Sequence, residues 1–420
     1  MALRFALAWL IVACLPPVLA AQESWPQFRG PAAAAAAPQA RLQDQFASKS
    51  LLWRTRLPGP GASSPVVHSG RVFLTCYSGY GLDPQEPGDM DNLRLHVVCV
   101  DAQSGRVLWQ KEVPPQLPEQ PYRGFITRHG YASNTPVVEP DRVYVHLGRA
   151  GLFAFDFQGR RLWHASLGKG RHSWGSAGSP VLYHDLVIVN TSVEDGSLQA
   201  FDKQTGRRVW RTPGVRRCWG SPVLVTTAQG EVELVVSMQG AIWGLDPATG
   251  EKLWQCQGIQ DYVCPTPVVH GDVIYAIGGR RAQCVAVRAG GRGDVTETHR
   301  LWQARVGANV PSPVFYQGYL YWVNDRGQAV CVRAEDGQVV YQRRVGRGRT
   351  VVYASTVLVG DKLLAVSRHN GIFLLAASPE YRLLGRNTLE DDSTFNATAA
   401  VAGGRLYLRS DQYLYCFKAR

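Results

Sequence analysis

Short segments rich in aromatic and small polar residues recur along the chain, most of them directly before a strand-like segment that begins Ser-Pro-Val or Thr-Pro-Val. Flat aromatic walls with a few hydrogen-bonding groups suit a planar cofactor, a sugar or a docked peptide. A second interpretation is that the rings simply plug a central channel, and the sequence leaves both open. The candidate residues of this surface are Tyr131, Asn134, Trp174, Arg217, Trp219, Tyr262, Asn309, Tyr353, Phe395 and Asn396.

Arginine recurs in the same segments, and the whole chain has a formal net charge of +12. Guanidinium groups bind carboxylates and phosphates well, so any ligand of this surface is expected to be an anion. The positive charge could attract anionic envelope polymers or acidic proteins, although a solvated surface is the favoured interpretation. No block of like charge appears, so we expect no nucleic-acid partner. The arginines are Arg123, Arg128, Arg171, Arg216, Arg217, Arg347 and Arg349.

No linear catalytic motif is present. The chain has neither a Gly-x-Ser-x-Gly nucleophile elbow nor a His-x-x-x-His pair. Acidic residues between Tyr77 and Arg94 lack the alternation and glycine of a calcium-binding loop. We therefore expect no metal site and lean against an enzyme, although distant segments of a repeat fold can assemble an active site.

A nine-residue motif, Asp-x-x-Thr-Gly-x-x-x-Trp, explains how these segments could be positioned, because it recurs along the chain. A strand ending at the Asp, a glycine turn and a second strand carrying the aromatic residue form a hairpin. A Trp in every unit can pack across the neighbouring unit, which favours a structural role over ligand stacking. The expected docking residues are Trp53, Trp109, Trp163, Trp210, Trp254, Trp302 and Tyr341.

The Ser/Thr-Pro-Val segments set the phase of the repeat, with two degenerate copies near the carboxy terminus. Eight units of roughly 43 residues result, each with room for four short strands. This pattern predicts an all-β, eight-bladed β-propeller of four-stranded antiparallel blades. The last unit, from Thr398 to Phe417, supplies only three strands. We expect Leu51 to Leu57 to be its fourth strand, so that the N-terminal strand closes the ring and removes exposed edges.

The amino terminus resembles an export signal. Residues 1–21 contain Arg4, an apolar core and a small-residue cleavage site, which predicts an extracytoplasmic protein, periplasmic or secreted. Cleavage and acylation at Cys14, which would make a lipoprotein, is the less favoured alternative. Residues 22–50 are expected to form an extended arm crossing the surface, and deletion of 22–45 should then be tolerated. Residues 51–420 form the propeller.

Eight cysteines remain after the export signal. No pair has the two-residue spacing of a zinc knuckle or a redox dithiol. Buried free thiols are the simplest interpretation. A disulfide between Cys256 and Cys264 is the alternative in an oxidising compartment.

The Asp-x-x-Thr-Gly-x-x-x-Trp units with their Ser-Pro-Val strands resemble the repeats of the PQQ-like (quinoprotein dehydrogenase-like) β-propeller family over about residues 51–417. The segment Trp25-Pro-Gln-Phe-Arg-Gly-Pro31 resembles the mature start of secreted bacterial PQQ-binding-like repeat proteins. The family includes quinone-dependent dehydrogenases and the non-catalytic outer-membrane assembly lipoprotein BamB, to which the chain is distantly similar. A vicinal Cys-Cys pair and the large insertions of the alcohol-oxidising members are missing, so their catalytic residues are not transferred.

Three functions are compatible with these observations. The first is an exported, non-catalytic monomeric propeller that binds envelope or secreted proteins and carries no cofactor. The second is a small quinoprotein oxidoreductase of alcohols or sugars that uses PQQ and calcium. The third is a carbohydrate-binding propeller. Because the repeats come without a recognisable group of catalytic residues, the first function is favoured.

Overall fold

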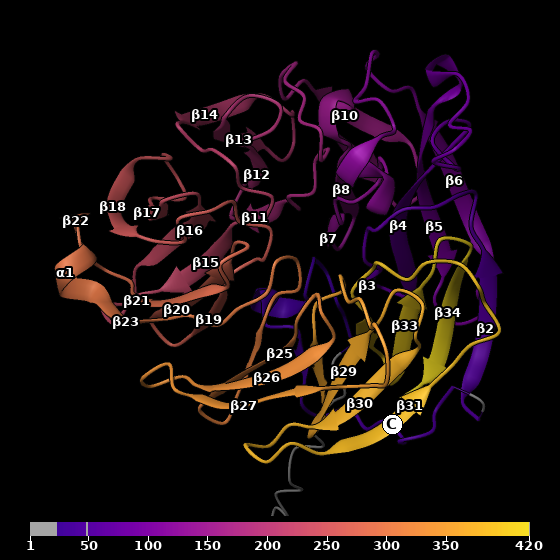
Figure 1. Cartoon of the computed structure of the whole chain (residues 1–420). Helices are drawn as coiled ribbons and strands as arrows, with labels where there is room; N and C mark the ends of the chain where they lie inside the picture. Colours follow the sequence, from indigo (N-terminus) through magenta and orange to yellow (C-terminus); the bar gives the residue numbers. More distant parts are fainter. Residues whose placement is uncertain (1–22, 48, 420) are drawn as a thin grey trace, which may run out of the picture.

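The computed structural model describes residues 23–47 and 49–419, which form eight β-sheets around a central axis (Figure 1). The prediction of an eight-bladed propeller of four-stranded antiparallel blades is confirmed. The predicted export signal and Cys14 lie outside the described residues. No helix within the described ranges is long and apolar enough to cross a membrane.

Each blade runs from an innermost to an outermost strand. Blade 1 has β3 (Val66–His68), β4 (Arg71–Ser78), β5 (Arg94–Asp101) and β6 (Val107–Val113), and blade 2 has β7 (Val137–Glu139), β8 (Arg142–His146), β9 (Leu152–Asp156) and β10 (Arg161–Ala165). Blade 3 has β11 (Val181–Tyr183), β12 (Leu186–Thr191), β13 (Ser197–Asp202) and β14 (Arg208–Pro213), and blade 4 has β15 (Val223–Thr226), β16 (Val232–Met238), β17 (Ala241–Leu245) and β18 (Lys252–Gln257).

The second half of the ring repeats this order. Blade 5 has β19 (Val268–His270), β20 (Val273–Gly278), β21 (Gln283–Arg288) and β23 (Arg300–Ala304), and blade 6 has β24 (Val314–Tyr316), β25 (Tyr319–Val323), β26 (Gln328–Arg333) and β27 (Val339–Arg344). Blade 7 has β28 (Val357–Val359), β29 (Lys362–Val366), β30 (Ile372–Ala376) and β31 (Leu383–Asn387), and blade 8 has β32 (Ala400–Ala402), β33 (Arg405–Arg409), β34 (Tyr413–Lys418) and β2 (Leu51–Arg56). The helical turns are η1 (Pro31–Ala33), η2 (Met90–Asn92), η3 (Gly124–Arg128), η4 (Gly148–Ala150) and α1 (Thr296–His299).

The ring closes between the two ends of the chain, as predicted. Strand β2 pairs antiparallel with β34, and Trp53 lies opposite Cys416. Figure 1 shows the indigo strand β2 beside the yellow strand β34. Because the pairing satisfies the backbone groups of the β34 edge, blade 8 is complete.

The recurring tryptophans join neighbouring blades. In the regular pattern, the indole N–H donates to a backbone carbonyl in the next blade, as Trp163 does to Lys203 at 2.9 Å. The ring also covers the glycine of that turn: a Cβ on Gly206 would lie 2.6 Å from the Trp163 ring. A side chain is therefore excluded at the recurring glycine for two reasons, its φ of 70° and the ring above it. The same indole bond is made by Trp53, Trp109, Trp210 and Trp302.

Trp254 departs from this pattern. Its indole N–H donates to the Glu233 carboxylate of its own blade at 2.7 Å. An insertion in blade 5 carries α1 and the short strand β22 (Gly293–Asp294), which pairs parallel with β18. The insertion replaces the usual glycine turn, and the Trp254 ring is fully buried among residues of blades 4 and 5. At the docking position of blade 6, Tyr341 contacts the Tyr381 ring of blade 7 at a centroid distance of 5.6 Å.

The segment expected to cross the surface as an arm, residues 22–50, is partly buried, because its first part enters one end of the channel while later residues such as Arg41 and Gln43 are exposed. Trp25 is 0% exposed and its backbone pairs with Val67 on the innermost strand of blade 1. Strand β1 (Ala36–Ala37) pairs parallel with β28 of blade 7. Phe46 is also fully buried. Alanine-rich composition suggested a linker, but small side chains also allow a backbone to pass through a narrow channel.

Arg29 is the charged residue of this buried segment. Its side chain is 0% exposed, and it donates to the carbonyls of Ala33 and, across the channel, Pro313. Burial without a carboxylate lowers the pKa of the guanidinium to about 9. We name residues 23–37 the plug, because they contact the inner strands of several blades at one end of the ring.

The eight cysteines of the described residues are all free thiols, and only Cys264 is half-buried rather than buried. The alternative of a Cys256–Cys264 disulfide is therefore not formed.

Candidate functional site

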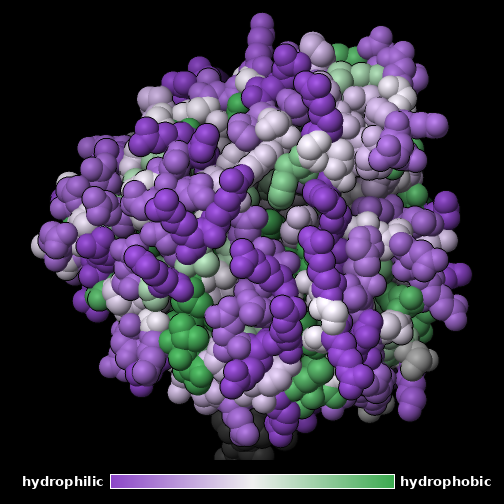
Figure 2. Space-filling view, in the orientation of Figure 1, coloured by the Kyte–Doolittle hydropathy of each residue, from purple (hydrophilic) through white to green (hydrophobic). Residues whose placement is uncertain are grey.

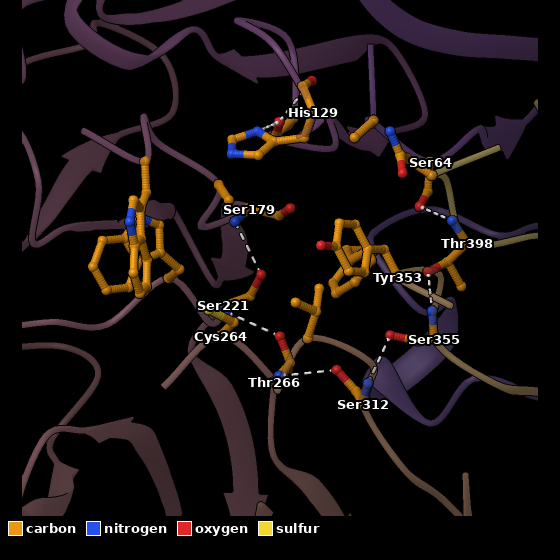
Figure 3. Close-up of a pocket in the computed structure, with 18 of the residues that line it drawn as sticks. Ser64, His129, Ser179, Ser221, Cys264, Thr266, Ser312, Tyr353, Ser355 and Thr398 are labelled. Carbon is orange, nitrogen blue, oxygen red and sulfur yellow. Dashed lines mark hydrogen bonds between the residues drawn. The ribbon is translucent and has the colours of Figure 1, made fainter. Parts of the chain in front are cut away.

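A closed belt of hydrogen bonds surrounds the channel at the start of the innermost strands. In every blade, the backbone N–H of one Ser or Thr donates to the hydroxyl of its counterpart in the next blade, at 2.9 to 3.1 Å. Figure 3 shows six of these bonds in sequence from Ser179 to Ser64. The belt explains why each repeat has a Ser or Thr at this position, which proline follows in six of the eight repeats. Its members are Ser64, Thr135, Ser179, Ser221, Thr266, Ser312, Ser355 and Thr398.

The connections that precede the inner strands, together with the turns after the second strand of each blade, form one end of the ring, which we name the mouth. The plug fills the opposite end. A pocket of about 120 Å³ lies between them, and its wall includes seven hydroxyls of the belt. Phe28 of the plug lines it together with Phe125, Trp174 and Tyr353 of the mouth. The pocket is therefore closed on one side by the plug and surrounded by aromatic rings on the other.

Four of the residues predicted from the sequence line this pocket: Trp174, Trp219, Tyr353 and Asn396. Trp174 and Trp219 pack at a centroid distance of 4.8 Å. Tyr262 adjoins Trp174 edge-on at 4.4 Å, and its hydroxyl donates to Asn309 at 2.5 Å. Six of the ten predicted residues therefore belong to one aromatic cluster with its hydrogen-bonding partners.

The other four lie elsewhere. Tyr131 and Asn134 face a second cavity between blades 2 and 3. Phe395 lies under a neighbouring loop, where it stacks on Tyr415 at 6.3 Å. Arg217 is exposed on the rim and does not reach the pocket.

Phe125 and His129 also line the pocket, although neither is among the ten candidate residues, and both lie in the long insertion before blade 2 that breaks the repeat. Phe125 contacts Trp174 at 5.0 Å and Tyr353 at 6.2 Å. His129 hydrogen-bonds the Ser133 hydroxyl at 2.7 Å. Burial lowers the pKa of His129 to about 4, so the ring is neutral at pH 7.

Arg368 holds this insertion in place, and sequence reasoning missed it as well. Its guanidinium lies 4.9 Å from the centroid of the Tyr353 ring and donates to Asn396 Oδ1 at 2.9 Å. It also donates to the Arg128 carbonyl at 3.0 Å. Because Asn396 donates to the same carbonyl at 2.8 Å, η3 is tied to blades 7 and 8 across the mouth.

The described residues that line the pocket include no carboxylate, ammonium or guanidinium group. Within the described ranges, no group of three or more His, Cys, Asp or Glu residues could hold a metal ion. PQQ carries several carboxylates and works with calcium, which requires oxygen ligands. The residues present do not fit this cofactor with its metal, and a pocket of about 120 Å³ lies below the ~300 Å³ of ordinary small-molecule sites.

The rim of the mouth is charged, in contrast to the pocket. Arg216, Arg217, Arg347 and Arg349 are exposed, and none forms an ion pair with a described carboxylate. Figure 2 shows that hydrophilic residues dominate the face seen in Figure 1, with a hollow near its centre. An uncharged aromatic pocket with unpaired guanidinium groups on its rim can hold an apolar side chain of an acidic partner.

Solved structures with this fold include the assembly protein BamB and a dehydrogenase. BamB from Moraxella catarrhalis is similar with a TM-score of 0.62 and 14% identity, covering 88% of this chain and 97% of that one. The quinohemoprotein alcohol dehydrogenase from Comamonas testosteroni is similar with a TM-score of 0.65 and 13% identity, covering 94% and 80%. Identities this low show the fold alone.

Relatives by sequence likewise include BamB and an enzyme. BamB from Yersinia pestis is 23% identical over 290 residues, which is 66% of each chain. Tetrathionate hydrolase from Acidianus ambivalens is 31% identical over 144 residues, 29% of this chain and 26% of that one. The chain thus spans only about a quarter to two thirds of the length of these relatives.

The fold, the docking tryptophans and the belt define a PQQ-like β-propeller repeat protein. The family model described as outer membrane protein assembly factor BamB matches residues 45–171, 93–343 and 194–420. The chain belongs to this family.

Proposed function

We propose that this chain is an exported, non-catalytic propeller that binds proteins in the cell envelope through its mouth. Family membership supports a role in protein assembly, and the predicted export signal supports an extracytoplasmic location. The observation that carries the proposal is the combination of an uncharged aromatic pocket with a rim of arginines that lack carboxylate partners among the described residues. Such a surface is complementary to an acidic segment with one apolar anchor.

The charge on the mouth is uneven. Exposed acidic residues lie in the loop of blade 1, Asp83 and Glu86, and after the last strand of blade 7, Glu390 and Asp392. A partner segment would therefore dock with its acidic stretch over the connection between blades 3 and 4, where Arg216 and Arg217 are exposed without an ion pair to a described carboxylate. The uneven charge fixes one orientation and speeds association.

Charge reversal tests this proposal. The variant Arg216→Glu, Arg217→Glu, Arg347→Glu changes the mouth, and Arg106→Glu, Arg207→Glu, Arg382→Glu makes the same change in exposed turns at the opposite end. Both variants and the parent are immobilised and exposed to envelope extract. We expect at least one protein that the parent and the opposite-end control retain, that the mouth variant loses, and that added salt releases. Equal retention by all three, or by none, would contradict a mouth-directed partner.

The quinoprotein alternative predicts a different result. Mixing the parent with PQQ and calcium would then produce a change in visible absorbance and dye-linked oxidation of an alcohol or sugar. We expect neither, because the pocket offers no charged partner for the cofactor among the residues that the structure describes.

A further inference from the structure

The belt has hydrogen-bonding capacity that the described chain does not use. Seven of its eight hydroxyls line the central pocket (Figure 3), and all seven residues are at most 7% exposed. Each hydroxyl accepts a backbone N–H from the preceding blade, and no described group accepts the O–H that it can donate in return. A buried hydroxyl without an acceptor costs free energy, so the belt is complementary to a polar group placed in the pocket.

The end of the pocket nearest the mouth is aromatic. Phe125, Trp174 and Tyr353 are half-buried, so their rings reach both the pocket and the surface of the mouth. Phe125 packs against the other two rings with interplanar angles of 36° and 27°. These walls are flat and apolar, and they make more contact with a ring than with a flexible chain.

The charges around the pocket favour an uncharged ligand. Among the described residues, no charged side chain lines the pocket. Charged groups of both signs lie behind its wall: Arg29, Arg128 and Arg368, against Asp261 and Asp325. An ion moved into this space would lose its hydration without gaining a partner of opposite charge.

The volume of the pocket limits the ligand to about one ring. The pocket offers about 120 Å³. A protein cavity of ~150 Å³ takes one benzene molecule. Phe28 of the plug lines the far side. A sugar would place hydroxyls against the aromatic walls as well, whereas a phenol has its hydroxyl at one end and a flat apolar ring at the other.

We propose that the central pocket binds an uncharged phenol, with the ring between the aromatic walls and the hydroxyl on the belt. A phenol hydroxyl both donates and accepts, and so can each belt hydroxyl after it has accepted its backbone N–H. A tyrosine side chain carries the same group. The anchor of a partner at the mouth is therefore a tyrosine, a statement that rests on the function proposed above.

The first experiment titrates the full chain with p-cresol and with toluene, which differ only by the hydroxyl. We expect 1:1 binding of p-cresol and at least tenfold weaker binding of toluene, measured by calorimetry. In NMR spectra of the parent, p-cresol should shift backbone amides that donate to the belt hydroxyls, and toluene should shift them less. Absence of p-cresol binding, or equal affinity for toluene, would overturn the proposal.

A set of variants tests whether the belt holds the phenol hydroxyl. Each of the seven pocket hydroxyls is removed in turn, Ser to Ala and Thr to Val. Thr135→Val is the matched control, because Thr135 belongs to the belt and does not line the pocket. We expect at least one of the seven variants to bind p-cresol at least fivefold more weakly with toluene unchanged, and the control to bind both like the parent. Parental p-cresol affinity in all seven would refute the contact with the belt.

A variant that fills the pocket gives a test that leaves every belt bond in place. Ala177 lines the pocket, so Ala177→Leu should abolish binding of p-cresol. Ala248→Leu makes the same change in the exposed turn between β17 and β18 and should have no effect. If Ala177→Leu binds p-cresol as tightly as the parent, the phenol lies outside the central pocket and the proposal is wrong.

Two peptides separate a tyrosine of a partner from a free phenol. One is an acidic peptide with a central Tyr, and the other has Phe in its place. If the source is a partner, the Tyr peptide should bind at least tenfold more tightly than the Phe peptide and p-cresol, and should lose affinity in Arg216→Glu, Arg217→Glu. If p-cresol binds and neither peptide does, the pocket takes a free phenol and the tyrosine anchor is wrong. Retention of envelope proteins in the charge-reversal experiment tests the mouth independently of these results.

Discussion

Replacing Trp25 by Ala tests whether the plug stabilises the ring. An aromatic side chain buries ~150–250 Å², which at ~25 cal/mol per Å² corresponds to ~4–6 kcal/mol as an upper value. Trp25 is 0% exposed and its indole N–H has no partner among the described residues, so the substitution breaks no hydrogen bond to them. We expect the free energy of unfolding in urea to fall by ~3–5 kcal/mol, in the range of other large core truncations.

Leu52→Ala serves as the control, because Leu52 is 47% exposed on an outer strand and should change the unfolding free energy by less than ~0.5 kcal/mol. If Trp25→Ala behaves like this control, the plug does not fill the channel in solution. Deletion of 22–45, which the sequence suggested would be tolerated, should then also be harmless; the structure predicts that it is destabilising.

Three further results are expected. Gly206→Ala should lower the free energy of unfolding by ~1–3 kcal/mol more than Gly240→Ala. Both glycines have a positive φ, but only Gly206 lies under an aromatic ring, that of Trp163. Equal losses of stability in thermal or urea unfolding would refute the ring contact. Deletion through Leu57 should expose the β34 edge and produce aggregates in size-exclusion chromatography, whereas a soluble monomer of parental stability would show that ring closure is dispensable. His129 should titrate with a pKa of about 4 by NMR. Between about pH 4 and 6.5 the folded state binds fewer protons than the unfolded state, so this residue makes the free energy of unfolding fall as pH falls. The variant His129→Asn should lose less stability in that range than the parent, and an equal pH dependence of the two would contradict this.

The propeller and its closure were predictable because their signals are local and repeated. Most units carry their own turn glycine and aromatic residue, and the missing fourth strand of the last unit matched the unpaired strand around Trp53. Burial of the plug was not predictable, since it depends on contacts such as that of Arg29 with Pro313, which are 284 residues apart. An alanine-rich segment has the same composition whether it lies on a surface or in a channel.

The candidate site was predictable in part. The pocket contains Trp174, Trp219 and Tyr353, which all lie in the connections before the innermost strands. Because they occupy equivalent positions of the repeat, the fold brings them together at one end of the ring. Phe125 and Arg368 lie outside those positions and could be placed only by the structure. The hydroxyls before each proline were visible in the sequence, but the belt was not, because its bonds join each hydroxyl to the neighbouring blade.

Protein binding at the mouth has one direct test, which is site-specific crosslinking in the cell of origin. A photoreactive phenylalanine replaces Phe125, which lines the pocket, and in a second strain it replaces Val209, which is 44% exposed on the outer strand β14. We expect a crosslinked envelope protein from the Phe125 position, its loss when Arg216 and Arg217 are changed to Glu, and none from Val209. No crosslink at Phe125, or the same products from both positions, would contradict protein binding at the mouth.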